Sequence, residues 1–150
     1  MADDISTEIY KSLRAAQEKY DYFLLAASGA AIGFAMTQTR TASISWSQIP
    51  LGFAVVCWGL SFFFGCRHLQ YVASSLYANF ELTKVQNGSN PLSGTDPQRI
   101  QAASEGIRKA IQSNSDRSNC LARLQFRLLV AGAICYIAWH ILGMSLRAVC

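Results

Sequence analysis

Charged side chains are scarce in this sequence. Asp, Glu, Lys and Arg make up 15% of the 150 residues, whereas a soluble domain carries about 25%. Three segments contain no charged residue at all, namely 22–38, 49–66 and 128–146. Three long apolar runs in so short a chain leave too little polar sequence to cover them, which disfavours an ordinary soluble domain.

Patterns typical of catalytic and metal sites are also missing. The five cysteines include no Cys-x-x-Cys pair, and no histidine lies at a spacing typical of a shared metal site. The sequence has no phosphate-binding loop, no nucleophile beside a base and no acidic pair within an apolar segment. We therefore expect no metal, no cofactor and no enzymatic activity.

The three apolar segments predict transmembrane helices. At 1.5 Å per residue each covers roughly 26–29 Å, close to the hydrocarbon thickness of a bilayer. The leader, residues 1–21, is long and acidic at its start, unlike the short basic n-region of a signal peptide. We therefore expect an all-α membrane protein in which 22–38, 49–66 and 128–146 are retained spans. The alternative is that these segments are buried core helices.

The distribution of basic residues predicts the topology. The segment 67–127 carries eight basic residues against four acidic ones, and the leader carries three basic residues. The loop 39–48 and the tail 147–150 carry one each. Since basic residues near span ends favour the cytoplasmic side, the leader and 67–127 are predicted inside, and the loop and tail outside.

The leader itself predicts a helix. Its apolar residues recur at spacings of three and four, and Asp4 or Ser6 is a candidate N-cap. Nothing interrupts the pattern before Tyr22, so leader and first span are predicted to form one helix. Its apolar face has two interpretations: a packing surface in the cytosol, or a surface that lies in the headgroups of the membrane.

The segment 67–127 predicts a cytoplasmic helical hairpin. A helix leaves the second span at Arg67 and is expected to end at Asn87-Gly88, because both residues tolerate the left-handed cap. A second helix is expected to begin at Pro97, capped by Thr95 or Asp96. Its apolar stripe includes Ile100, Ala103, Ile107 and Ile111, and the polar stretch 113–119 predicts that this helix weakens or breaks.

Basic residues of this hairpin are candidates for a polyanion site. Their charge predicts binding to nucleic acid or a nucleotide, although no recognised nucleic-acid motif is present. Anionic lipid is the alternative partner, and it explains best the basic residues next to the spans. The candidate ligand-binding residues are Arg99, Arg108, Lys109, Arg117 and Arg123.

Small residues in the spans predict close helix packing. Gly29 and Gly33 form a G-x-x-x-G pattern in the first span, a motif that lets helix backbones approach in lipid. The second span contributes Gly59, and the third contributes Gly132 and Gly143. We expect these glycines to hold a homo-oligomer. The alternative is that they only close the monomer.

Polar groups inside the spans are few. His140 is the only histidine within them, and Ser61 and Thr37 add hydroxyl groups. Such groups usually face the protein interior or a water path, so we interpret these three as candidate pore residues. The alternative for His140 is a hydrogen bond at a helix interface, with Tyr136 as a neighbouring partner.

One part of the sequence resembles a known group of proteins. The stretch Lys19-Tyr20-Asp21-Tyr22-Phe23-Leu24-Leu25 and the later Met36-Thr37-Gln38-Thr39 resemble the first span of small bacterial membrane proteins from anti-phage defence operons. The layout is most similar to the Hailong-type effector. The resemblance covers residues 19–39 and the layout, and it carries over no functional residue. It implies a channel in the bacterial inner membrane, governed by a DNA or nucleotide oligomer that a partner nucleotidyltransferase makes.

Three functions are compatible with these features. The first is a homo-oligomeric, ligand-gated channel effector in antiviral defence, which is the function we expect. The second is a membrane-anchored adaptor without a pore, whose basic hairpin recruits a cytoplasmic partner. The third is a small transporter, which the near absence of charge within the spans disfavours.

Overall fold

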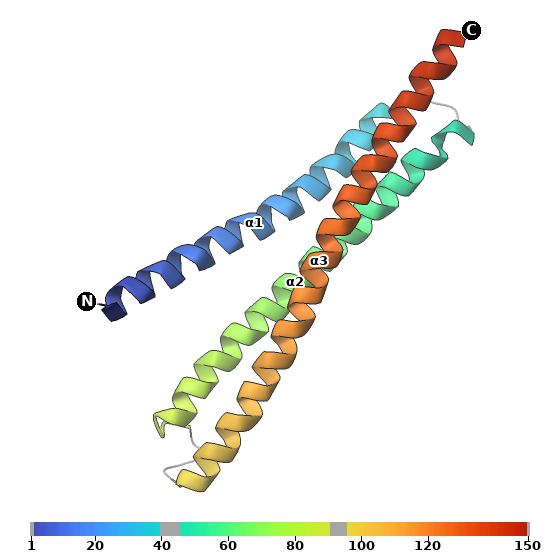
Figure 1. Cartoon of the computed structure of the whole chain (residues 1–150). Helices are drawn as coiled ribbons and strands as arrows, with labels where there is room; N and C mark the ends of the chain where they lie inside the picture. Colours follow the sequence, from blue (N-terminus) through green and yellow to red (C-terminus); the bar gives the residue numbers. More distant parts are fainter. Residues whose placement is uncertain (1, 40–45, 91–95, 150) are drawn as a thin grey trace. The chain divides into compact units, whose positions relative to one another are not determined.

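A computed structural model of the chain describes residues 2–39, 46–90 and 96–149. Within these residues it contains helices and no strand (Figure 1): α1 (Ala2–Gln38), the short 3-10 helix η1 (Trp46–Gln48), α2 (Ile49–Gln86) and α3 (Pro97–Val149). The all-α prediction is confirmed. By length and composition, α2 and α3 are long and apolar enough to cross a membrane.

Helix α1 joins the leader to the first apolar segment without interruption, as predicted. The chain up to Ser28 contains neither glycine nor proline, and alanine, leucine, glutamate and lysine in the leader all favour helix. The helix already begins at Ala2, so the expected N-cap at Asp4 or Ser6 is wrong. Both residues lie inside the first two turns of the helix.

The end of α2 follows its local sequence. The last helical residue is Gln86, and Gly88 has a φ of 66°, a left-handed conformation that glycine adopts without steric cost. The backbone N–H of Ser89 donates to the carbonyl of Lys84 (2.9 Å), and that of Gly88 donates to the carbonyl of Val85 (3.1 Å). These two bonds form a Schellman motif, so the predicted stop at Asn87-Gly88 is confirmed.

Helix α3 begins at Pro97 with Asp96 as its N-cap. The Gln98 backbone N–H donates to Asp96 Oδ1 at 3.0 Å, which confirms one of the two expected caps; the other, Thr95, lies outside the described residues. The predicted weakening at 113–119 is wrong, because the helix runs on through this stretch. Asn114 and Ser118 turn toward the neighbouring helix and bond there, which offsets their low helix propensity.

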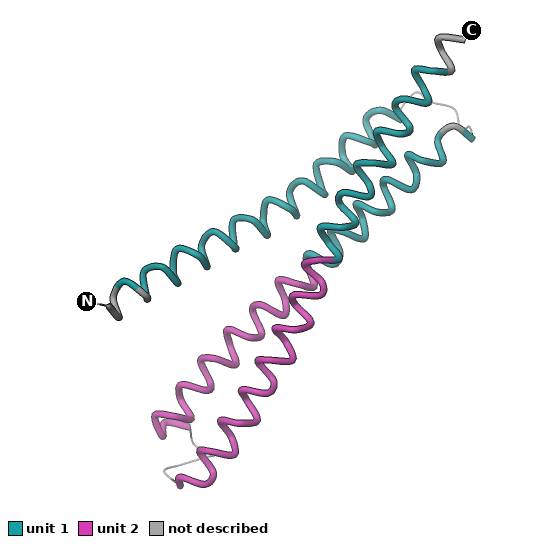
Figure 2. Tube along the Cα trace, viewed as in Figure 1, with its two compact units in different colours: residues 1–65, 124–150 teal, residues 66–123 magenta. Residues whose placement is uncertain are grey.

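The chain divides into two compact units (Figure 2), one of residues 1–65 and 124–150 and the other of residues 66–123. In unit 1, α1 packs with the first part of α2 and the last part of α3. Its buried core consists of Ala35, Leu51, Ala54 and Trp58. The Tyr136 ring packs beside that core, with its centroid 5.8 Å from that of Trp58 and 6.0 Å from that of Phe34.

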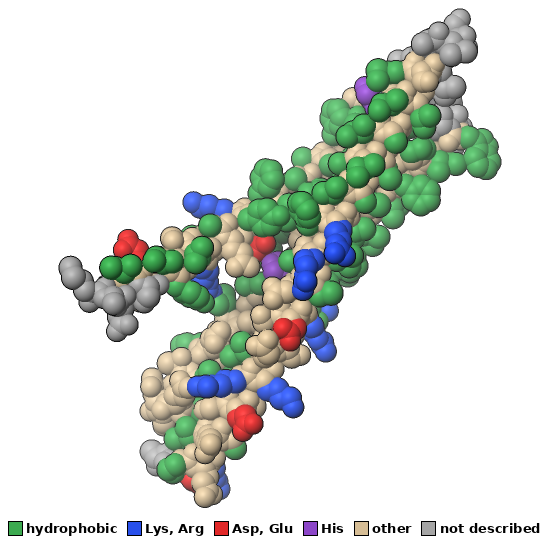
Figure 3. All heavy atoms as spheres, in the orientation of Figure 1, with side chains coloured by type: hydrophobic (Ala, Val, Ile, Leu, Met, Phe, Trp, Pro, Cys, Tyr) green, Lys and Arg blue, Asp and Glu red, His purple; other side chains and the backbone are tan. Residues whose placement is uncertain are grey.

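Much of the apolar surface of unit 1 remains exposed. On the face shown in Figure 3, hydrophobic side chains cover the unit 1 parts of α2 and α3. Large apolar side chains of all three helices are more than half exposed, among them Phe23, Phe34, Phe53, Phe63, Ile134 and Ile141. Contiguous apolar surface on this scale is typical of contact with lipid or with another protein.

Unit 2 pairs the later part of α2 with the earlier part of α3. His68 Nδ1 lies 2.8 Å from Ser118 Oγ, and Asn114 Nδ2 donates to Ser74 Oγ at 3.2 Å. Because residues later in α2 meet residues earlier in α3, the two segments run antiparallel. The polar pairs specify the register of the two helices, since a shift would leave the buried His68 without Ser118.

Candidate functional site

The candidate polyanion residues all lie in unit 2 and are exposed. Arg99 Nε lies 3.5 Å from Asp96 Oδ2 at the start of α3. Among the residues that the structure describes, Arg108, Lys109, Arg117 and Arg123 form no ion pair with a carboxylate. These four positive charges therefore remain available to an external anion.

The five residues are spread along α3 rather than gathered in one patch. At about 100° per residue, Lys109 and Arg123 lie on the outer face, Arg108 lies on one edge, and Arg99 and Arg117 lie on the other. From Arg99 to Arg123 the helix rises roughly 36 Å. An elongated polyanion can contact such a row, whereas a mononucleotide is too short to do so.

Two arginines of unit 2 converge on Tyr71, an arrangement that sequence analysis missed. The guanidinium carbon of Arg67 lies 5.6 Å from the centre of the Tyr71 ring, one helical turn away. Arg117 on the facing helix lies close enough to the Tyr71 hydroxyl to stabilise its ionised form. The interaction with Arg117, helped by the charge of Arg67, holds the pKa of the Tyr71 hydroxyl below its ordinary value.

Gly132 is the candidate glycine that is packed within the chain. A Cβ at this position would lie 2.5 Å from Trp58 Nε1, so any larger residue displaces the indole. The same indole N–H donates to the Leu129 carbonyl at 3.3 Å. Gly132 therefore allows α2 and α3 of one chain to pack closely. At this position the packing agrees with the alternative that the glycines only close the monomer.

The other candidate glycines have open space beside them among the described residues. A Cβ added at Gly29, Gly33, Gly59 or Gly143 would meet no atom there within 4 Å, apart from the backbone of its own helix. Gly65, which sequence analysis did not single out, is packed instead: its Cβ would lie 2.5 Å from Gln125 Nε2 and 2.8 Å from Leu25. Glycine spacing alone therefore does not distinguish a packed glycine from an open one.

Ser61 belongs to a buried polar cluster of unit 1. Its hydroxyl donates to the Gln125 carbonyl at 2.8 Å and lies 3.2 Å from Ser28 Oγ. The Ser28 hydroxyl in turn donates to the Leu24 carbonyl at 2.8 Å. Ser28 and Ser61 are 0% exposed, so Ser61 lies between helices of the single chain. Hydroxyl bonds of this kind hold helices together in lipid.

Gln125 completes this cluster and was missed by sequence analysis. Its side chain is 1% exposed, and its Nε2 has no hydrogen-bond partner among the described residues. The signal was present in the sequence, because Ile107, Ile111, Asn114, Ser118, Leu121 and Gln125 recur at alternating spacings of four and three. That stripe faces α2, so Gln125 occupies a position normally taken by an apolar residue.

His140 and Thr37 are exposed on unit 1. The His140 ring stacks on Tyr136, with centroids 6.5 Å apart and planes 9° apart, so the expected neighbour is in place. Thr37 Oγ1 donates to the Phe34 carbonyl at 2.7 Å within its own helix. Both polar groups therefore face outward from the single chain.

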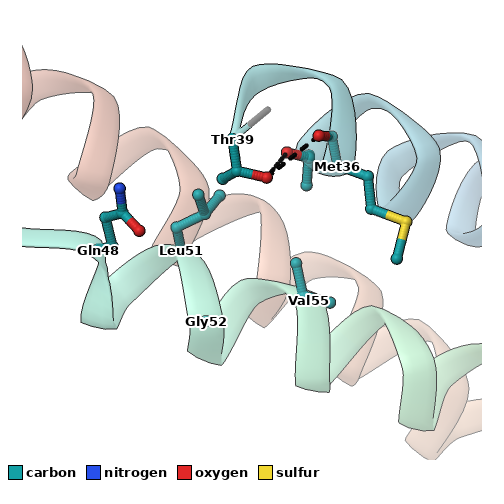
Figure 4. A pocket seen from close by; sticks show the side chains of 7 residues that line it. Met36, Thr39, Gln48, Leu51, Gly52 and Val55 are labelled. Carbon is teal, nitrogen blue, oxygen red and sulfur yellow. Dashed lines mark hydrogen bonds between the residues drawn. The ribbon is translucent and has the colours of Figure 1, made fainter. Parts of the chain in front are cut away.

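One shallow pocket lies where α1 ends and α2 begins (Figure 4). It has a volume of about 370 Å³, and its lining is Ala35, Met36, Thr39, Gln48, Leu51, Gly52 and Val55. The Thr39 hydroxyl contacts the carbonyls of Ala35 and Met36 rather than the pocket. No lining residue is charged, and so the pocket offers no acid, base or nucleophile.

No protein-family model matches this chain, and no curated protein or solved structure is similar enough to it to count as a match. Within the described residues, no group of three His, Cys, Asp or Glu side chains is placed to hold a metal ion. The surfaces and side-chain clusters of the chain itself are therefore the features that indicate its function.

Proposed function

We propose that this chain is one protomer of a homo-oligomeric membrane channel, controlled by a polyanion on a cytoplasmic helical hairpin. The observation that carries the proposal is the exposed row of basic residues on α3, four of which form no ion pair among the described residues, in a chain with two membrane-capable helices. The ligand we propose is a DNA or nucleotide oligomer supplied by a partner nucleotidyltransferase. The role is that of an effector in bacterial anti-phage defence.

The proposed membrane arrangement has three spans. Residues 22–38 of α1 join 49–66 and 128–146, with the N-terminus in the cytoplasm and the C-terminus outside. Exposed Phe23 and Phe34 support the first span, because apolar aromatic side chains on the outside of a helix are stable in lipid and costly in water. The open glycines Gly29 and Gly33 lie on the same helix and leave its backbone accessible to a second copy.

Cysteine labelling tests this topology. With the other cysteines replaced by serine, a chain that retains only Cys150 should react with a membrane-impermeant maleimide in spheroplasts. A matched chain that retains only Cys120, which is exposed in unit 2, should react only after the membrane is opened. The reverse order of labelling would contradict the proposed orientation.

Oligonucleotide binding tests the polyanion site. The triple variant R108E/K109E/R117E should bind single-stranded DNA at least on the order of 100-fold more weakly, because three cations are lost and three anions added. Wild-type binding should weaken as salt is raised, since phosphate contacts release counterions. The control K11E/R14E/K19E in the leader makes the same charge change, and it should bind normally. Equal losses of DNA affinity in both variants would show that binding depends only on the net charge of the protein and not on the residues of α3.

The side chains that would line the proposed pore determine how it opens and closes. The spans provide bulky apolar side chains such as Phe62 and Phe63, with His140 and Thr37 as exposed polar groups. An apolar constriction closes by losing its water, and opens when the helices move apart. A ligand shifts this equilibrium only if it prefers one state. We propose that a polyanion bridging several hairpins holds the closed state.

Membrane potential tests conduction. Cells that express the protein without a source of ligand should depolarise, as read by a potential-sensitive dye, and purified protein should pass current in planar bilayers. Adding the oligonucleotide should reduce that current, and it should not do so for R108E/K109E/R117E. Absence of current with inserted, oligomeric protein would contradict the channel.

A non-conducting adaptor is the second candidate, and the leader favours it. Ile5, Ile9, Leu13 and Tyr20 form an apolar stripe that is at least half exposed. An amphipathic helix with an uncovered stripe is a docking surface for another helix or for the headgroup region. Inserted protein that carries no current but retains a cytoplasmic protein through this stripe would favour the adaptor.

A further inference from the structure

Arg67, Tyr71 and Arg117 lie together in unit 2, and Arg117 is also one of the basic residues of α3 that are candidates for the polyanion site. Arg67 and Tyr71 are one turn apart on α2, and Arg117 reaches Tyr71 from α3. The flanking contacts agree with this register, because His68 meets Ser118 and Ser74 meets Asn114 on either side of the pair. The juxtaposition therefore follows from how the two helices pack.

Neither arginine is neutralised by an acid. Arg67 Nη1 donates to the Gln70 amide oxygen at 3.0 Å, and within the described residues neither Arg67 nor Arg117 pairs with a carboxylate. The neighbouring Asp116 instead accepts from Gln112 Nε2 at 3.1 Å. Two guanidinium groups and one hydroxyl are thus directed at one region, which favours an anion that several donors can share.

The position of Arg67 in the chain indicates where that anion lies. Arg67 is the first residue after the apolar segment 49–66, and both arginines are exposed. At the end of a membrane span a guanidinium group lies at the level of the lipid phosphates. Tyrosine is also common at this level, with its ring in the interface and its hydroxyl toward water.

We propose that Arg67, Tyr71 and Arg117 form a binding site for a single phosphate group, the headgroup phosphate of an anionic phospholipid in the cytoplasmic leaflet. This inference rests on the proposed membrane insertion, and the site shares only Arg117 with the proposed oligonucleotide site. Arg67 would bind the phosphate while stacked on the Tyr71 ring, with Arg117 on the opposite side. A lipid held between α2 and α3 would tie unit 2 to the bilayer surface.

Lipid retention tests this site. Full-length protein is purified in mixed micelles with equal amounts of phosphatidylglycerol and phosphatidylcholine, and the lipids retained are counted by native mass spectrometry. Wild type should retain phosphatidylglycerol selectively. Arg67→Gln and Arg117→Gln should each reduce that selectivity about fivefold, the effect expected for one basic residue at a membrane surface. Arg67→Lys keeps the charge but not the planar stacking group, and should fall between wild type and Arg67→Gln.

The matched control is Arg99→Gln, an exposed arginine of the same helix that lies beside Asp96. It should keep full selectivity, and so should R108Q/K109Q, even though this double variant is expected to weaken oligonucleotide binding. Equal retention of both lipids by wild type, or equal losses in Arg99→Gln and Arg67→Gln, would overturn the proposal. Inorganic phosphate is the second probe. The lipid assignment is wrong if the protein binds inorganic phosphate, loses this binding in Arg67→Gln, and shows no lipid selectivity. The ligand would then be a soluble phosphate.

Failure of this site and failure of the proposed function give different results. A protein that alkaline carbonate releases from membranes is not inserted, which refutes the membrane function itself. An inserted protein that binds oligonucleotide but shows no lipid selectivity refutes only the phosphate site. Helical circular dichroism of each variant confirms that it is folded before lipids are counted.

Discussion

Gly132→Leu should destabilise the three-helix packing of unit 1 by about 3 kcal/mol or more, whereas Gly143→Leu on the same helix should leave it nearly unchanged. At Gly132 the added side chain overlaps the Trp58 indole, whose N–H then loses the Leu129 carbonyl. At Gly143 the space beside the backbone is open. The two substitutions change composition identically, so the difference between them isolates the contact with Trp58.

The measurement is unfolding in mixed detergent micelles, followed by tryptophan fluorescence and far-ultraviolet circular dichroism. Gly132→Ala is the milder variant, and it should also lose stability, even though alanine favours helix over glycine by about 1 kcal/mol. Gly143→Ala should gain a little stability for the same reason. Equal stability of the two leucine variants would show that the indole can move away at no cost.

Replacing both Gly29 and Gly33 by isoleucine should dissociate the proposed oligomer and leave the protomer folded. Among the described residues of one chain, a Cβ at either position would meet no atom of another helix within 4 Å, so the added side chains cost no contact there. Between chains they would separate two helix backbones by the width of a side chain. A loss of about 2 kcal/mol or more per interface is expected from such overpacking.

Light scattering of the detergent-solubilised protein gives the mass of the assembly. Gly106→Ile is the matched control, because Gly106 is exposed, also has open space beside it, and lies outside the predicted spans. Its oligomeric mass should equal that of wild type. An unchanged mass for the Gly29 and Gly33 variant would remove these glycines from the interface. Loss of helical signal would instead show that α1 needs them within the protomer.

The helices themselves could be predicted from local sequence because their signals are local. The start of α2 at Ile49 follows the beginning of an apolar run, and its end follows Asn87-Gly88, where glycine adopts the left-handed cap. Asp96 and Pro97 mark the start of α3 in the same way. The prediction that the helix weakens at 113–119 was wrong because it considered only low helix propensity. The facing helix supplies hydrogen-bond partners for Asn114 and Ser118.

The candidate site was predictable only in part. Exposure of the basic residues on α3 followed from their spacing opposite the apolar stripe. The convergence of Arg67 and Arg117 on Tyr71 could not be predicted from spacing, because it joins residues far apart in the chain. Ser61 had been interpreted from its polarity alone, and polarity cannot distinguish a hydroxyl that lines a water path from one that bonds a neighbouring helix.

By itself, the sequence determined the apolar and charged segments, the end of α2, the start of α3 and the exposure of the basic residues on α3. Each of these depends on neighbours within one or two turns, and hydrophobic periodicity and capping act over that range. Only the tertiary structure decided that Gly132 and Gly65 are packed while Gly29 and Gly33 are open. Which glycine allows a close approach depends on the helix opposite, and the facing side chains, Trp58 and Gln125, come from elsewhere in the chain.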